Sequence, residues 1–157
     1  MSGYAGQILR VDLSKKKIVK EPLNDRFARK YLGARGINAK ILYDEIKPGV
    51  DSLSKDNILL FGAGPLCGTV APSASRTTAT AKSPLSNGIG DSHAGGHFGP
   101  ELKYAGYDNI VFYGRAEKPS FLWICDENVE LLDAQNLWGK TTWQTDKMIK
   151  DDLGDEE

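Results

Sequence analysis

Long apolar runs, cysteine and an excess of charge are all scarce in this chain, and each shortage excludes a class of protein. No stretch approaches the roughly 18 apolar residues of a membrane span. The formal net charge is −1, whereas nucleic-acid binders normally present a basic face. The first residues, MSGYAGQILRVDL, lack the basic-then-apolar pattern of a secretory signal. We therefore expect a cytoplasmic protein that binds neither a membrane nor nucleic acid.

Cysteine occurs only as Cys67 and Cys125, and the two are too far apart in sequence for a C-x-x-C motif. An iron–sulfur cluster of the four-iron type needs four thiolates, so this chain cannot ligate one by itself. Unpaired cysteines in a reducing compartment are commonly interior. We expect both thiols to be buried.

The length of 157 residues suffices for one domain with a real core, and the pattern predicts an α+β fold. We expect mixed β-sheets, hairpins near both ends and flanking helices. Asn24, Gly33 and Thr142 are the predicted helix-capping residues. Two hairpins are predicted, one from strands 5–13 and 16–22 and the other from strands 120–125 and 129–132. Further strands are predicted over 57–61, 76–82 and 109–113. Helices are predicted over 25–33, 36–46, 96–105 and from 142 onward.

The stretch from Ser75 to Tyr107 holds both histidines and six glycines. A small-residue strand comes first, then a glycine-rich loop, then an amphipathic segment whose Pro100 suits the first turn of a helix. Glycine lets the backbone approach a large ligand, and a helix start offers N–H groups to an anion. The small residues leave room either for a flat ligand or for close sheet packing. By itself the stretch indicates a site for a phosphate-bearing ligand.

Arg76 ends a loop of small residues, where a guanidinium can bind a phosphate through two parallel hydrogen bonds. The alternative is an ordinary exposed arginine, free or paired with a carboxylate. Lys82 and Lys103 can either add to phosphate binding or remain solvated. A side-chain metal site at His93 with Asp91 and His97 is disfavoured, because histidines four apart share a face only on a helix and the intervening glycines oppose one.

The three tryptophans can stack on a flat ring or pack in the core. Trp123 lies in an apolar strand and Trp143 on a helix face, so we expect both in the core. Trp138 carries no assignable chemistry.

Several segments resemble, in the same order, the N-terminal domain of the tungsten-containing aldehyde:ferredoxin oxidoreductase family. The resemblance extends from Tyr4 to about Leu153. It is carried by YLGARGINAKIL, FGAGPLCGTVAPSASR, AKSPLSNGIGDSHAGGHFGPELKYAGYDNIVFYGRAEKP and DAQNLWGKTT.

The resemblance implies a tungstopterin, with molybdenum as an alternative metal, and assigns part of its site to this chain. Arg76 matches an arginine that contacts the pterin. His93 matches a position, often asparagine, whose backbone carbonyl holds a magnesium ion between pterin phosphates. Ala94, Gly95 and Gly96 match backbone contacts to the cofactor. His97 is interpreted as structural.

The resemblance further implies oxidation of an aldehyde to a carboxylic acid, with electrons passing through a 4Fe-4S cluster to ferredoxin. The cluster ligands and the acid/base residues belong to later helical domains. Residues 1–157 are therefore interpreted as a single, incomplete pterin-binding domain without a catalytic residue of its own, and inactive alone. The alternatives are a small subunit completed by a partner chain and a metal-free structural or binding domain. A homodimer is one possible assembly.

Overall fold

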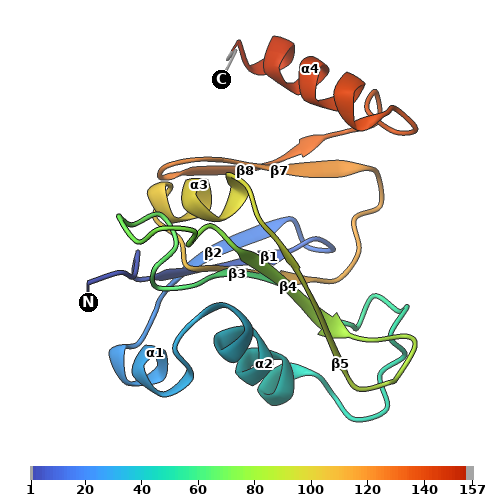
Figure 1. The fold of residues 1–157 in the computed structure, drawn as a ribbon. Coiled ribbons are helices and arrows are strands. Elements are labelled where there is room, and N and C mark those ends of the chain that lie inside the picture. Colours follow the sequence, from blue (N-terminus) through green and yellow to red (C-terminus); the bar gives the residue numbers. More distant parts are fainter. Residues whose placement is uncertain (1, 155–157) are drawn as a thin grey trace.

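The computed structural model describes residues 2–154, whose elements are stacked in layers (Figure 1). Two helices cover one face of a six-stranded sheet, while a third helix and a two-stranded sheet cover the other, and a fourth helix lies beyond them. No helix in this part of the chain is long and apolar enough to cross a membrane. The helices are α1 (Asp25–Tyr31), α2 (Ala34–Glu45), α3 (Phe98–Tyr104) and α4 (Thr142–Leu153). The strands are β1 (Gln7–Asp12), β2 (Lys17–Pro22), β3 (Leu59–Ala63), β4 (Thr77–Lys82), β5 (Ile89–Ala94), β6 (Asn109–Tyr113), β7 (Ser120–Cys125) and β8 (Asn128–Asp133).

The large sheet has the order β2-β1-β6-β3-β4-β5, and β7 pairs with β8 in the small one. Only the β1–β6 pair is parallel; the other pairs of the large sheet are antiparallel. The sheet is therefore mixed, and the β1–β2 and β7–β8 hairpins lie near the two ends of the chain. The predicted α+β fold with mixed sheets and hairpins is confirmed.

The sheet has an apolar cluster on each face. An apolar face of α2 packs on one side, where Ile37, Ile41 and Leu42 are buried, and Ile46, just after the helix, is half-buried. On the other side, side chains of α3, β1 and β6 form a second cluster that the β7–β8 hairpin covers. The second cluster consists of Leu9, Val11, Leu102, Tyr107 and Ile110, with Leu122, Ile124, Val129 and Leu131 among the side chains packed against it.

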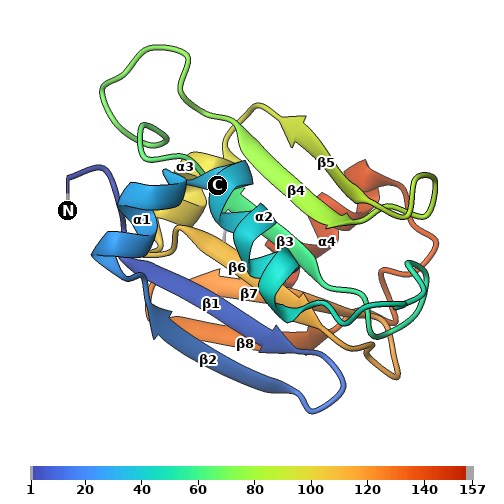
Figure 2. The ribbon, with the colours of Figure 1, turned by 90° about the horizontal axis from the view of Figure 1, so that it is seen from below.

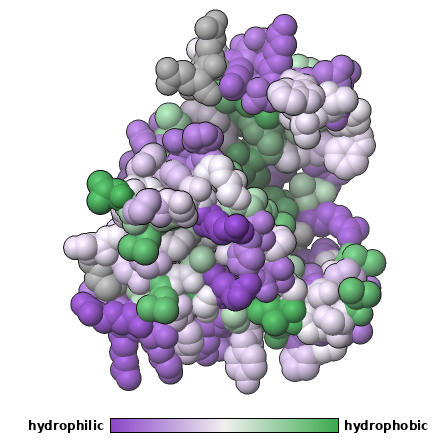
Figure 3. Space-filling model, viewed as in Figure 1, coloured by the Kyte–Doolittle hydropathy of each residue, from purple (hydrophilic) through white to green (hydrophobic). Residues whose placement is uncertain are grey.

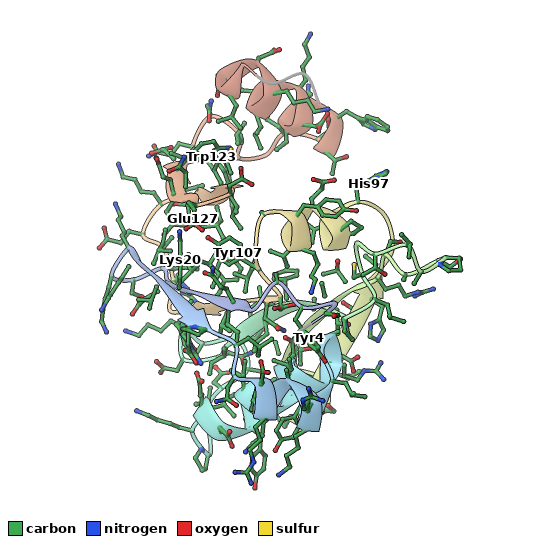
Figure 4. The ribbon with its side chains drawn as sticks, turned by 90° about the vertical axis from the view of Figure 1, so that its left-hand side faces the viewer. Tyr4, Lys20, His97, Tyr107, Trp123 and Glu127 are labelled. Carbon is green, nitrogen blue, oxygen red and sulfur yellow. The ribbon has the colours of Figure 1, made fainter. Side chains whose placement is uncertain are left out.

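The turn between β7 and β8 makes further polar contacts with the rest of the domain (Figure 4). Lys20 of β2 forms an ion pair with Glu127, and the Tyr107 hydroxyl donates to the Asp126 carbonyl oxygen at 3.2 Å. The small sheet thus gains support that an isolated two-stranded hairpin lacks.

The boundary between α1 and α2 differs from the prediction. Asn24 caps α1 as expected, accepting from the Arg26 and Phe27 N–H groups. The helix ends at Tyr31 rather than Gly33, because Leu32 adopts a left-handed φ of 64°. Gly33 then serves as the N-cap of α2, which begins at Ala34, two residues earlier than predicted.

A larger difference concerns residues 89–94, predicted as loop and found as strand β5. Apart from Ile89 its residues are polar or very small, so the sequence shows no alternation of apolar and polar side chains. The backbone pairing with β4 makes the strand, from Thr77 opposite Ala94 to Lys82 opposite Ile89. β5 is the outer edge of the large sheet (Figure 2). An edge strand of this kind needs no apolar face.

Helix α4 has no buried residue, and apolar surface is visible in the recess below it (Figure 3). Its N-cap is Thr141 rather than Thr142, in a capping box with Gln144. The prediction that Trp143 packs in the core is wrong, because the residue is 85% exposed. Trp138 is exposed as well, and Trp123 is half-buried.

Candidate functional site

The structure brings all five predicted cofactor-binding residues to one corner of the large sheet. Arg76 directly precedes β4, whose first residue, Thr77, pairs with Ala94 at the end of β5. His93 and Ala94 end β5, and Gly95 and Gly96 follow it. All five residues are exposed. We call residues 93–96 together with Arg76 the shelf.

The surface of the shelf is open. A Cβ added to Gly95 or Gly96 would meet no atom within 4 Å, and Gly96 has a φ of 104°. Arg76 forms no ion pair or side-chain hydrogen bond with any other residue between 2 and 154. The guanidinium and the glycine backbone are therefore both accessible to a ligand.

The base of the shelf is tightly packed. A Cβ on Gly99 of α3 would lie 2.8 Å from both the Cys67 sulfur and the Thr77 hydroxyl oxygen. This glycine lets α3 lie directly against the start of β4. Cys67 is buried, as expected, and burial raises the pKa of its thiol, which keeps it protonated. Cys125 is exposed, so the prediction that both thiols are buried is wrong for Cys125, which lies at the end of the covering hairpin.

His93 is held by three side chains around its ring. Thr78, its Cα partner on β4, places its hydroxyl oxygen 3.0 Å from Nδ1, and the Asp91 carboxylate lies 3.0 Å from Nε2. Arg35, in the first turn of α2, contacts the same ring nitrogen and donates from Nε to Asp91 at 2.6 Å. The three side chains fix the orientation of the imidazole at the end of the edge strand.

These contacts continue into a buried polar network beneath α2. Asn38 donates to the Thr80 hydroxyl oxygen at 3.1 Å and to the Thr78 carbonyl oxygen at 3.2 Å. Asn109 of β6 donates to the Asn38 side-chain oxygen at 2.8 Å. Asn38, Asn109, Thr78 and Thr80 are all buried, so this part of α2 is rigidly fixed against β4.

Other candidates from the sequence do not join the shelf. Lys82 donates to the Val50 carbonyl oxygen, and Lys103 forms a buried ion pair with Asp108. His97 occupies the N-cap position of α3 without a side-chain hydrogen bond, and lies at the start of that helix (Figure 4). Across residues 2–154, no group of three or more His, Cys, Asp or Glu side chains could hold a metal ion.

Sequence reasoning missed Arg35 and considered Asp91 only for a disfavoured metal site. The two residues are separated by 56 positions, and only the packing of α2 across β3 and β4 brings them together (Figure 2). No local pattern marks this pair, since nothing in the sequence around either charged residue points to the other.

Comparison with known proteins agrees with this architecture. Residues 8–157 match the sequence model of the aldehyde ferredoxin oxidoreductase N-terminal domain. The tungsten-containing aldehyde ferredoxin oxidoreductase of Pyrococcus horikoshii is 46% identical over 155 residues, which are 99% of this chain and 26% of that protein. The aliphatic sulfonate oxidoreductase WOR-like subunit of Pyrococcus furiosus is 38% identical over 142 residues, covering 88% of this chain and 22% of that protein.

A solved structure is also similar. The active site complex BamBC of benzoyl coenzyme A reductase, bound to 1,5-dienoyl-CoA, superimposes with a TM-score of 0.96 at 40% identity. The match covers 99% of this chain and 24% of that one. The chain thus spans about a quarter of the length of the proteins it matches. Both the family match and these relatives show that the chain belongs to the aldehyde ferredoxin oxidoreductase family, whose N-terminal domain it matches.

Proposed function

We propose that residues 1–157 supply part of the base on which a tungstopterin lies, within an oxidoreductase that oxidises aldehydes to carboxylic acids and passes electrons to ferredoxin. The observation that carries the proposal is the shelf itself. Arg76 and residues 93–96, separated in sequence, meet at one exposed corner with an unpaired guanidinium and open glycines.

The residues of the shelf fit the phosphates of a pterin. Arg76 offers the planar fork of donors that suits phosphate. Gly95 and Gly96 let a bulky ligand approach the backbone closely, since they present no side chain. The backbone carbonyl of His93 is the proposed ligand of a magnesium ion between the phosphates, consistent with the preference of magnesium for oxygen ligands. A guanidinium and backbone groups on one open surface are the features that support a phosphate site here.

The bound tungstopterin would supply the redox chemistry, and the residues of this chain would bind and orient it. The shelf is open on one side, so further pterin contacts have to come from other parts of the protein. The two cysteines are too few for a 4Fe-4S cluster, whose ligands are likewise proposed to lie elsewhere. Residues 1–157 alone are therefore not expected to oxidise aldehydes.

The names of the relatives support a role in binding the cofactor rather than the substrate. They refer to aldehydes, to aliphatic sulfonates and to benzoyl coenzyme A, yet all share this segment at 38–46% identity. A segment common to proteins with different substrates serves what they have in common. The same role would apply if this chain were a small subunit completed by a partner.

The proposal is tested by the Arg76→Ala variant of the full-length protein. The control is Arg29→Ala on α1, which removes the same positive charge at a site away from the shelf. Losing a charge-assisted hydrogen bond to phosphate weakens binding by about tenfold to a hundredfold. We therefore expect Arg76→Ala to lower the tungsten content per protein, measured by mass spectrometry, and Arg29→Ala to leave it unchanged. Arg76 is exposed, so the melting temperature of the cofactor-free form should shift by less than about 2 °C.

Two results would contradict the proposal. One is an unchanged tungsten content in Arg76→Ala. The other is an equal loss of thermal stability in the cofactor-free and cofactor-bound forms, which would make Arg76 a structural residue.

A further inference from the structure

We infer that Arg35 is a positioning residue for the phosphate site of the shelf, and that it acts by neutralising the carboxylate of Asp91. The inference rests on the proposed function and adds to it a residue of α2. It also explains how an edge strand that carries an acidic side chain can accept an anionic ligand.

The contact between the two side chains is short and well aligned. Arg35 Nε lies 2.6 Å from Asp91 Oδ2, and the same oxygen lies 3.0 Å from His93 Nε2. The Asp91 side chain is 22% exposed, whereas that of Arg35 is 61% exposed. The guanidinium therefore covers the carboxylate from the solvent side.

Asp91 is close enough to the shelf to influence an anion there. Alternate residues of a strand point to the same face, so Asp91 and His93 share one face of β5, next to the loop that begins with Gly95. Two residues advance about 7 Å along a strand, which is no more than the Debye length of about 8 Å at physiological salt. An unpaired carboxylate at this position would repel phosphate held at the His93 backbone.

The backbone segments that carry Arg35 and Asp91 are fixed in the fold. Arg35 belongs to the first turn of α2, which the buried hydrogen bonds of Asn38 hold against β4. Ala34, next to Arg35, lies so close to Gly62 that a Cβ there would be 3.1 Å from the Ala34 Cα. His93 is held in turn by Thr78. Asp91 pairs in the backbone register with buried Thr80 of β4, so the helix and the strand that carry the ion pair are both held by buried groups.

The test measures binding of inorganic pyrophosphate to the full-length protein freed of its cofactor. Calorimetry would compare the wild type with Arg35→Ala, Asp91→Asn, the double variant and Arg76→Ala, with Arg29→Ala as the charge control. An uncompensated carboxylate at this distance should weaken pyrophosphate binding by about fivefold to tenfold in Arg35→Ala. Removing the same carboxylate in the double variant should restore the affinity to within about twofold of the wild type.

If Arg35 had only a structural role, removing the Asp91 carboxylate as well would not restore the affinity for pyrophosphate. Unchanged affinity in Arg35→Ala would overturn the inference, and so would a double variant as weak as Arg35→Ala. Arg76→Ala separates this outcome from a failure of the proposed function. If Arg76→Ala weakens pyrophosphate binding and Arg35→Ala does not, only the inference fails; if Arg76→Ala has no effect, the phosphate site itself is wrong.

Discussion

Two ion pairs at opposite faces of the large sheet use the same chemistry in different surroundings. Lys103 of α3 pairs with Asp108 just before β6, and their side chains are 7% and 1% exposed. Arg35 pairs with Asp91 at the edge strand, where both partners reach solvent. The buried pair has a full set of partners, while the exposed pair borders an open surface.

Asp108 joins the N-terminal segment to α3 and β6, about 100 residues further along the chain. Its carboxylate accepts hydrogen bonds from the Ala5 and Gly6 N–H groups at 3.1 and 2.6 Å, and Lys103 also donates to the Gly3 carbonyl oxygen at 2.8 Å. The N-terminal segment, α3 and β6 therefore meet at one buried carboxylate. The two aspartates differ in burial and not in having a cationic partner. We infer that the buried Asp108 stabilises the fold, whereas the partly exposed Asp91 affects the charge of a binding surface.

The largest expected effect comes from breaking the buried pair. Asp108→Asn removes the charge opposite Lys103 and should destabilise the protein by about 3–5 kcal/mol, because an uncompensated ammonium then remains buried. Asp91→Asn, the same chemical change in the exposed pair, should alter stability by less than about 1 kcal/mol. Urea unfolding of both variants measures the difference. Equal losses of stability in the two variants would show that burial does not distinguish the two ion pairs.

Two glycines, one in the packed interior and one on the open shelf, should show the same contrast with a smaller difference in stability. A Cβ on Gly62 would lie 2.4 Å from Asn109 Nδ2 and 2.9 Å from Asn38 Oδ1, whereas a Cβ on Gly95 would meet no atom within 4 Å. Gly62→Ala should therefore destabilise the protein by about 1–3 kcal/mol, through overpacking and disturbance of the buried amides. Gly95→Ala should leave stability within about 0.5 kcal/mol of the wild type. Denaturant midpoints of the two variants provide the check, and a loss in Gly95→Ala as large as in Gly62→Ala would show that the shelf is packed rather than open.

The parts of the fold that bury apolar surface could be predicted from the sequence. The spacing of Ile37, Ile41 and Leu42 marks the buried face of α2, and the run NIVFY marks β6. These patterns arise because core side chains must follow the period of their element. The shelf residues could be named only through the family resemblance, since Gly-rich loops are common.

The remaining features depend on contacts between distant residues. β5 has no apolar face and forms through backbone pairing with β4, so no side-chain pattern predicts it. The contact between Arg35 and Asp91 follows from the placement of α2 across the sheet. Thr141 and Thr142 are chemically equivalent, and only the reciprocal hydrogen bonds with Gln144 identify the cap. Local sequence cannot supply this information.

Helix α4 provides the smallest expected effect, because it buries none of its residues. Trp143→Ala should change the hydrogen-exchange protection of the α4 amides by less than about twofold, since the side chain lies in solvent and alanine favours a helix. Thr141→Ala, which removes the capping hydroxyl of the same helix, should lower that protection by about fivefold, the equivalent of about 1 kcal/mol. If Trp143→Ala lowered protection as much as Thr141→Ala, the tryptophan would have to be packed against other groups, and α4 would belong with the buried regions of the molecule rather than with its open ones.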